Sequence, residues 1–462
     1  MRVCLISTYE LGHQPFALAS PARWLADEGA DVTCTDLAVE CLDEAALAEA
    51  GLIAIHLSMH TATRIAAAAV PKIRAINPDA HLCFYGLYAP VNDAYLRETL
   101  GGQSVLGGEV EGELVRLYRH LAHGEPWDGG DGVALIKHRF KVPRREGLPS
   151  LDNYATLDPG DGSQVTVGYT EASRGCKHLC RHCPVVPVYN GRFFIVSREV
   201  VLEDCRRQIA DGARHITFGD PDFFNGPGHA LKLVEAFHGE FPEVTYDATI
   251  KVEHLHQHAD KLARLRATGC LFVTTAVESV NDEVLAKLDK GHTRADFIAA
   301  VRAADAAGLT LSPTFIPFHP WATPEGYLDL LQLLAELDLI ENVAPIQLSI
   351  RLLIPQGSRI LELDDIHRYL DGFDAEKLSY RWSAGDPRAD ALQAEVRDAV
   401  QQGEREGAGR RAVFQRIWEL AHAACGRTAP PLPVSHHTGG VPAMSEPWYC
   451  CAEPTEEQLA QV

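Results

Sequence analysis

The amino-terminal part of the chain alternates short apolar runs with amphipathic stretches. Short apolar runs predict buried strands, and the stretches between them, such as residues 62–76, repeat with the period of a helix. Strands that alternate with helices favour a parallel sheet covered on both faces. The predicted strands are VCLIST (3–8), DVTCT (31–35), LIAIHLS (52–58) and HLCFYG (81–86). Residues 1–123 are therefore predicted to form a doubly wound α/β domain.

A second alternation follows a segment rich in Gly, Pro and charge, residues 124–165, which is typical of a surface linker. The strands predicted beyond it are QVTVGYTEA (164–172), ARHITFGD (213–220), VTYDATI (244–250), CLFVTTAVES (270–279), LTLSPTFIP (309–317) and APIQLSIRLLIP (344–355). Six βα-type units in a row favour a partial (βα)6 barrel over residues 166–358. In such a fold, ligands bind at the carboxyl ends of the strands.

The carboxyl-terminal part changes character again. Residues 359–432 read as mostly helical, with residues 389–406 and 410–425 as the clearest helices. Residues 433–462 contain too much Pro and Gly for a regular element and are predicted to be an irregular tail. The whole chain is thus predicted to be an α/β protein with a helical extension.

Composition and charge argue against some classes of function. The formal net charge is −21, so the long-range field repels a phosphate backbone and disfavours nucleic acid as the main partner. The start MRVCLISTYELGH has the pattern of a buried strand and not of a signal peptide. No run approaches 18 apolar residues, which argues against a membrane span. We expect a cytoplasmic enzyme that acts on a small molecule.

The twelve cysteines separate by spacing, because thiols in a cytosolic protein usually serve metals, catalysis or packing. Most lie in apolar or helical patterns, but Cys176, Cys180 and Cys183 form a CxxxCxxC triplet. Three thiolates that converge on one cluster leave one iron open to a ligand. A structural zinc site is the alternative, and it needs a fourth ligand such as His178 or His182.

CxxxCxxC in the loop after the first strand of a βα barrel resembles the radical S-adenosylmethionine (SAM) superfamily. The resemblance implies that the triplet holds a 4Fe-4S cluster whose open iron is chelated by the amino and carboxylate groups of SAM. An electron then cleaves SAM to methionine and a 5′-deoxyadenosyl radical. It also implies a reductant partner such as flavodoxin or ferredoxin. The cofactor carries the radical chemistry, and the protein positions and shields it.

Two further segments resemble SAM-binding segments of that superfamily. Residues 216–224, ITFGDPDFF, resemble the stretch after the second strand that holds the methionyl amine, although an Asp-Pro-Asp turn is also a common structural motif. Residues 275–293 resemble a G-x-E-S to K-G-H segment, with Ala276 in place of the usual Gly. Arg351 is a weaker candidate, for which a surface salt bridge is the alternative. The candidate SAM-binding residues are Gly219, Asp220, Asp222, Glu278, Ser279 and Arg351.

Three residues among or near these candidates carry further expectations. Ser279 is also expected to cap the helix that starts beside it. Lys251 and Glu253, after the third barrel strand, have no assigned role but are expected to face the same cavity.

The amino-terminal domain resembles the cobalamin-binding domain found ahead of many radical SAM barrels. Its end, residues 85–121, carries the likeness through Gly107, Gly108, Glu109, Glu111 and Glu113. The DxHxxG motif that supplies a histidine to cobalt is missing from the sequence. His56 and His60 are nearby alternatives, although a histidine on a buried strand is usually a core residue. Cobalamin binding is left open, because relatives can keep the fold alone.

The tail contains the adjacent pair Cys450 and Cys451, followed by Ala-Glu-Pro. This ending resembles radical SAM proteins with a CUAEP or CCAEP tail, some of which are selenoproteins, and the likeness covers nearly the whole chain. It implies that Cys450 acts as a nucleophile, a redox group or a soft-ligand donor. Both sulfurs can bind one soft ion such as arsenic(III). Two idle cysteines in a tail are the alternative.

Three functions are consistent with the sequence. The first is a radical SAM enzyme that methylates a small molecule or forms a carbon–heteroatom bond, with a metalloid or arsenical among the substrates to test. The second is a methylthiotransferase-like RNA-modifying enzyme, which the net charge of −21 and the missing basic RNA-binding extension disfavour. The third is a non-catalytic protein that binds cobalamin or a soft metal.

Overall fold

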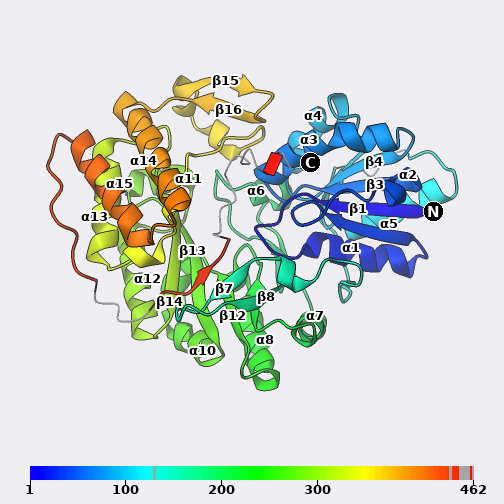
Figure 1. Cartoon of the computed structure of the whole chain (residues 1–462), viewed down its shortest axis with the longest axis horizontal. Coiled ribbons are helices and arrows are strands. Elements are labelled where there is room, and N and C mark those ends of the chain that lie inside the picture. The colour runs from blue at the N-terminus through cyan, green and yellow to red at the C-terminus, as the bar shows by residue number, and fades with distance from the viewer. Residues whose placement is uncertain (128–131, 436–439, 447–457, 460–462) are drawn as a thin grey trace.

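Two α/β units make up the protein, whose structure is a computed structural model that describes residues 1–127, 132–435, 440–446 and 458–459. In Figure 1 the amino-terminal unit is blue and lies to the right, and the second unit is green to yellow. The first unit contains a parallel six-stranded sheet of order β2-β1-β3-β4-β5-β6. Its strands are β1 (Arg2–Ser7), β2 (Asp31–Asp36), β3 (Ala50–His56), β4 (His81–Tyr85), β5 (Ser104–Gly108) and β6 (Gly132–Ala134).

Helices cover both faces of this sheet, as predicted. Alternate strand residues enter two separate cores, with Ile53 and Phe84 on one face and Leu52 and Cys83 on the other. The buried strands are apolar on both faces for this reason. The helices are α1 (Phe16–Asp27), α2 (Glu44–Ala48), α3 (His60–Ile76), α4 (Asp93–Glu98) and α5 (Glu111–Ala122).

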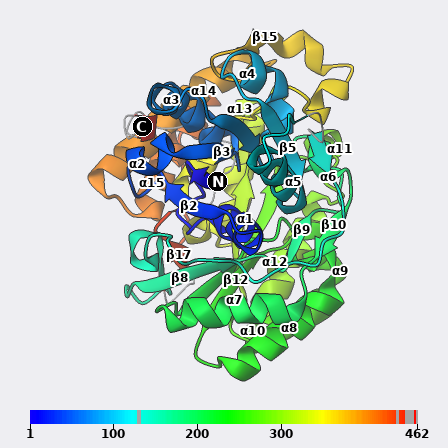
Figure 2. The same cartoon turned by 90° about the vertical axis from the view of Figure 1, so that its right-hand side faces the viewer.

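The second unit is built on a seven-stranded sheet of order β14-β13-β12-β11-β8-β7-β17. The pairs from β8 to β14 are parallel. Figure 2 shows α7, α8 and α10 along the edge of this unit that lies away from the first unit. The strands are β7 (Thr156–Asp158), β8 (Val165–Thr170), β11 (His215–Phe218), β12 (Thr245–Thr249), β13 (Cys270–Glu278), β14 (Thr310–Phe315) and β17 (Ala443–Met444). The main helices are α7 (Arg198–Ala210), α8 (Pro227–Glu240), α9 (Val252–Gln257), α10 (Leu262–Ala267), α11 (Asp282–Leu288), α12 (Arg294–Ala306) and α13 (Pro324–Glu336).

The predicted sixth barrel strand over residues 344–355 is wrong for most of its length. Residues 345–348 form a 3-10 turn that begins at Pro345, and the segment pairs with its neighbour only through the bridge between Phe318 and Arg351. The amide of Phe315, which a sixth strand would pair, donates instead to Gln347 Oε1 at 3.3 Å. The α/β fold class is confirmed, but the barrel closes less far than predicted.

The predicted linker and tail both contribute strands. Within residues 124–165, β6 extends the first sheet and β7 joins the second. The tail, predicted to lack regular structure, adds β17, whose Ala443 and Met444 pair antiparallel with β7. Ser445 N donates to Thr156 O at 2.8 Å and extends this contact. These segments therefore hold the two units and the tail together.

The helical extension agrees with the prediction apart from one hairpin, formed by β15 (Leu370–Asp374) and β16 (Ser379–Trp382). The two predicted helices are α14 (Pro387–Glu406) and α15 (Arg410–Ala424). Helix α14 begins earlier than predicted because the Asp386 side chain accepts from Arg388 N and Pro387 occupies the first turn. Across the described parts of the chain, we find no helix with the length and apolarity needed to cross a membrane.

Candidate active site

The carboxyl ends of the two parallel sheets face one common cavity of about 460 Å³. Loops that follow β1, β3, β4 and β5 line it on one side, and inward-facing residues of β8 and β11 to β14 line it on the other. In the first sheet the strand order reverses between β1 and β3, which is where doubly wound folds bind ligands. Barrels likewise bind ligands at the carboxyl ends of their strands. Both folds thus direct ligands into the same space.

All three cysteines of the CxxxCxxC loop line this cavity. The loop follows the short strand β9 (Ser173–Gly175) and ends at α6 (Val185–Tyr189). Asn225 fastens it by accepting from Lys177 N at 3.1 Å and donating to Gly175 O at 3.2 Å. Burial raises the pKa of the Cys176 thiol to about 11, so a bound cation must stabilise its thiolate. Three soft donors that face one cavity fit an iron–sulfur cluster with an open site.

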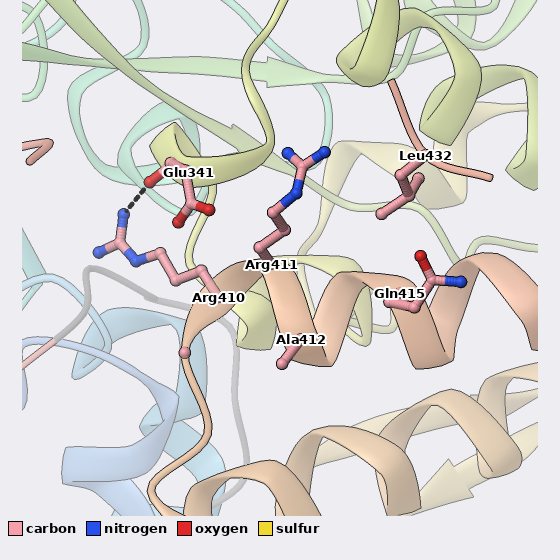
Figure 3. Close-up of a pocket in the computed structure, with 7 residues that line it drawn as sticks. Glu341, Arg410, Arg411, Ala412, Gln415 and Leu432 are labelled. Atoms are coloured by element: carbon pink, nitrogen blue, oxygen red, sulfur yellow. Dashed lines mark hydrogen bonds between the residues drawn. The ribbon is translucent and has the colours of Figure 1, made fainter. Parts of the chain in front are cut away.

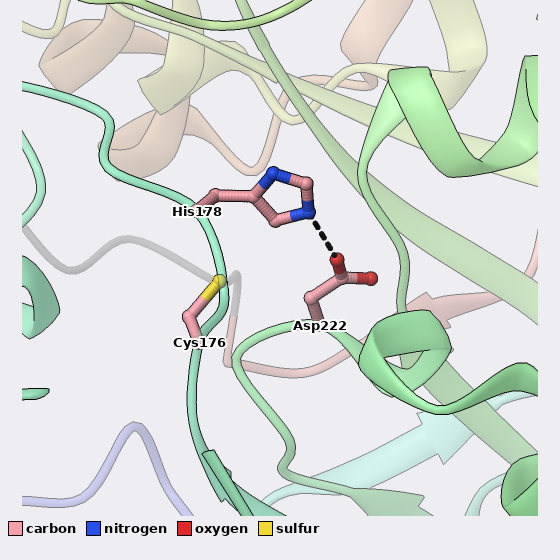
Figure 4. A group of neighbouring side chains, drawn as sticks. All are labelled: Cys176, His178 and Asp222. Carbon is pink, nitrogen blue, oxygen red and sulfur yellow. Dashed lines mark ion pairs between the residues drawn. The ribbon is translucent and has the colours of Figure 1, made fainter. Parts of the chain in front are cut away.

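Asp222 lies behind this loop and does not line the cavity. Its Oδ2 lies 2.7 Å from His254 Nδ1. The same oxygen lies 3.3 Å from His178 Nε2 (Figure 4). Burial opposes ionisation of Asp222, but the two histidines hold its pKa at about 2. Asp222 was expected to bind the methionyl amine of SAM. Its carboxylate instead faces His254 on α9 and His178 in the cluster loop, outside the cavity lining. Asp222 instead ties the cluster loop to α9.

One group of potential metal ligands occurs among the described residues: Cys176, His178 and Asp222, whose ligand atoms lie within 4.8 Å of one another. Neither histidine offered as a fourth zinc ligand is free of other partners. His178 faces Asp222, and His182 Nε2 lies 3.1 Å from Glu278 Oε1. The zinc alternative therefore needs these histidines to leave their carboxylates.

Glu278 ends β13 and reaches the cavity, as predicted. Its carboxylate lies 3.1 Å from Lys290 Nζ and 3.1 Å from His182 Nε2. Burial raises the pKa of Glu278, but Lys290 and His182 outweigh burial and hold it at about 2. The residue has a φ of +67°, in the region that favours glycine, which costs conformational energy and is characteristic of functional sites. Lys290 was not assigned a role from the sequence, although it lies in the segment that carries the resemblance.

Gly219 and Asp220 also line the cavity. A Cβ at Gly219 would lie 1.9 Å from the Tyr169 hydroxyl, so only glycine fits against that ring. Asp220 accepts from Ala172 N at 2.9 Å and Ser173 Oγ at 2.5 Å. Burial raises the pKa of Asp220 to about 7. Asp220 therefore supports the strand that leads into the cluster loop.

Comparison with known families identifies the segment that contains the cysteine loop. Residues 170–334 match the model of the radical SAM superfamily, and the match contains the three cysteines, Gly219, Asp220 and Glu278. The chain carries a radical SAM domain and is an enzyme. A 4Fe-4S cluster and SAM are the cofactors of such a domain, and the donor set at the cavity fits them.

Curated and solved proteins extend the comparison. The ribosomal protein uS12 methylthiotransferase RimO of Cereibacter sphaeroides is 28% identical over 217 residues, which cover 42% of this chain and 47% of that protein. The chain thus spans about half the length of this relative. The radical SAM methyltransferase TsrM from Kitasatospora setae has a TM-score of 0.60 at 19% identity, covering 73% of this chain and 71% of TsrM. The cobalamin-dependent SAM radical enzyme OxsB has a TM-score of 0.66 at 13% identity, covering 91% of this chain and 73% of OxsB. The structural likeness shows the fold.

Two predicted SAM ligands of the radical SAM domain lie elsewhere. Ser279 does not line the cavity and does not cap α11, because Asn281 is the cap and accepts from Glu283 N and Val284 N. Ser279 Oγ instead accepts from Asn281 N at 3.2 Å. Arg351 is also absent from the cavity lining.

The Arg351 side chain contacts the helical extension and not the cavity. Its guanidinium lies over the Trp382 ring, 3.7 Å from the centroid, and pairs with Asp390 at 2.5 Å. The salt-bridge interpretation of Arg351 is the one that this geometry supports.

Two of the three acidic residues that suggested a cobalamin-binding domain, Glu109 and Glu111, join the first unit to the radical SAM domain. Glu113 instead pairs with Arg116 on its own helix. Arg174, on β9, lies 2.6 Å from Glu111 and 3.3 Å from Glu109. Tyr189 OH donates to Glu109 at 3.0 Å. The side chains of Arg174, Glu109, Glu111 and Tyr189 are largely buried. Sequence reasoning missed Arg174, although its place two residues before Cys176 is a signal for a role in positioning the loop.

The two histidines considered for cobalt occupy different places. His56 lines the cavity, but its Nδ1 lies 2.7 Å from Glu10 Oε1. A Cβ at Gly86 would lie 2.7 Å from His56 Nε2, so that nitrogen is packed against the backbone. His60 is buried at the start of α3 and does not line the cavity. Neither placement makes a cobalt ligand.

Of the residues left unassigned, Lys251 lines the cavity and Glu253 does not. Lys251 Nζ lies 3.3 Å from Glu253 Oε2.

A second, more open depression of about 510 Å³ lies at the start of α15 (Figure 3). Arg410 donates to Glu341 O at 2.6 Å there, and Arg411 and Gln415 lie along the same helix. No cysteine of the described residues lines it, but Arg410 lines both this depression and the main cavity, so the two adjoin at the start of α15.

The described part of the tail forms one wall of the main cavity. Pro442, Ala443, Met444 and Glu446 line it, and the Tyr9 hydroxyl of the first unit donates to Glu446. The tail thus reaches the boundary between the two units. Cys450 and Cys451 lie outside the described residues.

Proposed function

We propose that the protein cleaves SAM reductively and transfers a methyl group to a small molecule held between the two units. One observation carries the proposal. The three cysteines of the radical SAM segment line the cavity that the carboxyl ends of both sheets face. The methyltransferase likeness of the fold supports methylation over carbon–heteroatom bond formation.

The residues around the cluster loop have the following roles in this proposal. Cys176, Cys180 and Cys183 hold the cluster, which when bound supplies the electron that cleaves SAM. Glu278, ionised through Lys290, presents a carboxylate to the SAM amine. Gly219 lets its strand end pack against the Tyr169 ring at the cavity wall. Enclosure between the two units excludes water from the reactive species.

We propose cobalamin as a further cofactor on the first-unit side of the cavity. Leu11, Met59, Leu87 and Tyr88 line that side, which is the edge where this strand order binds ligands. Both structural neighbours are radical SAM enzymes, and OxsB is cobalamin-dependent. Because His56 and His60 are engaged elsewhere, the chain would hold cobalamin without a histidine ligand to cobalt.

Cys450 is proposed to act at the same cavity as a nucleophile, redox group or soft-ligand donor. It follows Glu446 by four residues, which span at most about 14 Å of extended chain. Glu446 itself lines the cavity. Arsenic(III) compounds are therefore among the substrates to test, since two adjacent thiols bind soft ions.

A reductant is proposed to dock on the outer surface of the cluster loop. Leu179 is 40% exposed between two cluster cysteines. Lys177 and Arg192 flank it, and in the described parts of the chain neither has an ion-pair partner. Arg359 Nη1 donates to Leu179 O at 3.5 Å. Arg359 also pairs with Glu362 at 3.0 Å, so Lys177 and Arg192 supply the uncompensated positive charge. A basic rim around an apolar centre, on a chain of net charge −21, fits an acidic carrier such as flavodoxin or ferredoxin.

Methylthiotransfer is the second candidate, favoured by the similarity to RimO. Product analysis separates the two, because a methylthio group adds sulfur and a methyl group does not. The net charge disfavours an RNA substrate.

The test is anaerobic incubation of the reconstituted protein with SAM and dithionite. We expect 5′-deoxyadenosine or another SAM fragment, together with iron–sulfur absorption. Cys176→Ala should abolish both, with a loss above about a thousandfold, whereas Cys41→Ala, an exposed cysteine far along the chain, should retain them. Wild-type protein that binds no cluster would refute the proposal. In the same assay, unchanged turnover by Cys450→Ser would remove the role given to the tail.

A further inference from the structure

Polar side chains line the barrel beneath the cluster loop. Successive residues of a strand point to opposite faces, so Tyr246 and Ala248 of β12 enter the helix-covered core and Asp247 and Thr249 enter the cavity. Asp247 is buried yet lines the cavity. It is paired in register with Thr217 of β11. The barrel interior thus presents a carboxylate on its wall.

The carboxylate of Asp247 is held in place by one of its oxygens. Oδ1 accepts from Thr217 Oγ1 at 2.6 Å and from His215 Nε2 at 2.9 Å. His215 Nδ1 lies 2.7 Å from Thr245 Oγ1, so the threonine hydroxyl can donate to it and leave the proton on Nε2. Oδ2 has no hydrogen-bond partner among the described residues. One oxygen is therefore fixed, and the other is available to a ligand.

Among the described residues, Asp247 pairs with His215 at 2.9 Å and with no lysine or arginine. Elsewhere in this unit a buried aspartate does have such a partner: Asp204 lies 2.7 Å from Arg145. Burial lowers the pKa of His13, the nearby histidine from the first unit, to about 4, so His13 is neutral at physiological pH. A buried carboxylate without a cation is costly. A positively charged ligand would compensate it.

A second polar group points to the same conclusion. Thr314 lines the cavity and is 4% exposed, and its hydroxyl has no hydrogen-bond partner among the described residues. Buried hydroxyls are normally satisfied, so an unpaired one at a cavity wall indicates a missing ligand contact. Thr314 lies on β14, two strands from Asp247 and four residues beyond Thr310, the position in register with Asp247 through Phe272.

We propose that Asp247 binds the positively charged end of the substrate, a protonated primary amine, and that Thr314, nearer the carboxyl ends of the strands, contacts a polar group elsewhere on the substrate. The inference rests on the proposed function, because it places the substrate below the cluster loop. A substrate that carried a carboxylate or phosphate at this end would be repelled by Asp247. Asp247 therefore selects the substrate class, and His215 is a positioning residue that orients it.

The experiment measures binding of three matched probes to the anaerobically reconstituted full chain by calorimetry: phenethylamine, 2-phenylethanol and phenylacetate. Wild type should bind the amine at least about tenfold more tightly than the other two, as expected for a charge-assisted hydrogen bond. Asp247→Asn should lose this preference. Asp211→Asn, an exposed aspartate at the end of α7, should keep it. No amine binding, or an amine preference that survives in Asp247→Asn, overturns the inference.

Thr314→Val guards against a misfolded variant. It keeps the side-chain shape and removes a hydroxyl that has no partner among the described residues, so the Tm should hold or rise. Phenethylamine has no second polar group that could reach Thr314 from Asp247, so this variant should keep the wild-type amine preference. Loss of that preference would show that disturbance of the cavity wall, and not the charge of Asp247, accounts for the result with Asp247→Asn. Formation of 5′-deoxyadenosine by wild type is measured in parallel. Its absence counts against the proposed function, whereas its presence without amine preference counts against this inference alone.

Discussion

The strand ends near the cluster loop and those of the first sheet hold buried carboxylates in different ways. Glu278, at the end of β13, has Lys290 and His182 as partners, and its pKa is about 2. In the described part of the chain, the carboxylate of Asp36, at the end of β2, has only the Tyr154 hydroxyl at 3.0 Å and the Ala38 amide at 3.2 Å as hydrogen-bond donors. Burial raises the pKa of Asp36 to about 7.

The difference teaches that the partner, and not the depth of burial, decides the charge. Asp220 lies in the barrel yet has neutral partners, and burial raises its pKa to about 7 as well. A carboxylate that must be ionised to bind a cation is therefore built beside a cation or histidine of its own. Glu278 satisfies this condition at the cofactor site.

Removing the cation should have the largest effect on stability. Lys290→Met leaves Glu278 buried without its ammonium partner, and we expect a loss of about 3–5 kcal/mol in the free energy of unfolding. Lys287→Met is the matched control, because Lys287 is 30% exposed and pairs with Asp365, a contact worth less than about 1 kcal/mol. Urea unfolding of both variants is the measurement. Equal losses would show that Glu278 does not depend on Lys290.

Ionisation of Asp36 should lower the free energy of unfolding as the pH rises. Its folded pKa of about 7 exceeds the unfolded value of about 3.9. The stability it contributes is therefore present below pH 4 and is lost as the pH rises through 7. Between pH 5 and pH 8 wild type should lose about 2–3 kcal/mol from this group.

The Asp36→Asn variant should not show this loss of unfolding free energy between pH 5 and pH 8. Urea unfolding of both proteins at the two pH values is the measurement. Asp31→Asn is the control, because Asp31 is exposed on the same strand and pairs with Arg2. If Asp36→Asn unfolds with the same pH dependence as wild type, the titrating group is elsewhere.

The same contrast explains how far the sequence predicts the site. Strands β1 to β4 of the first sheet, the parallel strands of the second sheet, the helices of the extension and the three cysteines follow from periodicity and spacing. Strands β5, β6, β7 and β17 were not predicted. Gly219, Asp220 and Glu278 reach the cavity because they directly end or follow inward-facing strand positions. Asp222 does not, because its direction depends on His254, a residue 32 positions later.

Arg351 and Lys290 show the same limit from opposite sides. Arg351 is drawn away by Trp382, and no local pattern announces that contact. Lys290 follows a helix and reaches Glu278 across the loop, so its role depends on a tertiary contact. The sixth strand fails for a related reason, since the Gln347 side chain takes the place of a backbone partner.

Surface charge beside the cluster loop should have the smallest effect, because solvent and salt screen it. Lys177→Glu should slow flavodoxin-driven SAM cleavage several-fold at low ionic strength, since reversing a charge at the rim of an interface mainly changes the association rate. The rate with dithionite should not change, because a small reductant does not need the docking surface. Added salt should bring wild type and variant together.

The control for this prediction is Lys72→Glu, an exposed lysine on α3 of the first unit, which makes the same charge change away from the loop. Equal slowing by both variants would mean that net charge, and not the surface around Leu179, governs the encounter. Slowing of the dithionite reaction by Lys177→Glu would instead mean that the substitution disturbs the loop that holds the cluster. Only a selective loss with the protein reductant locates docking at the cluster loop.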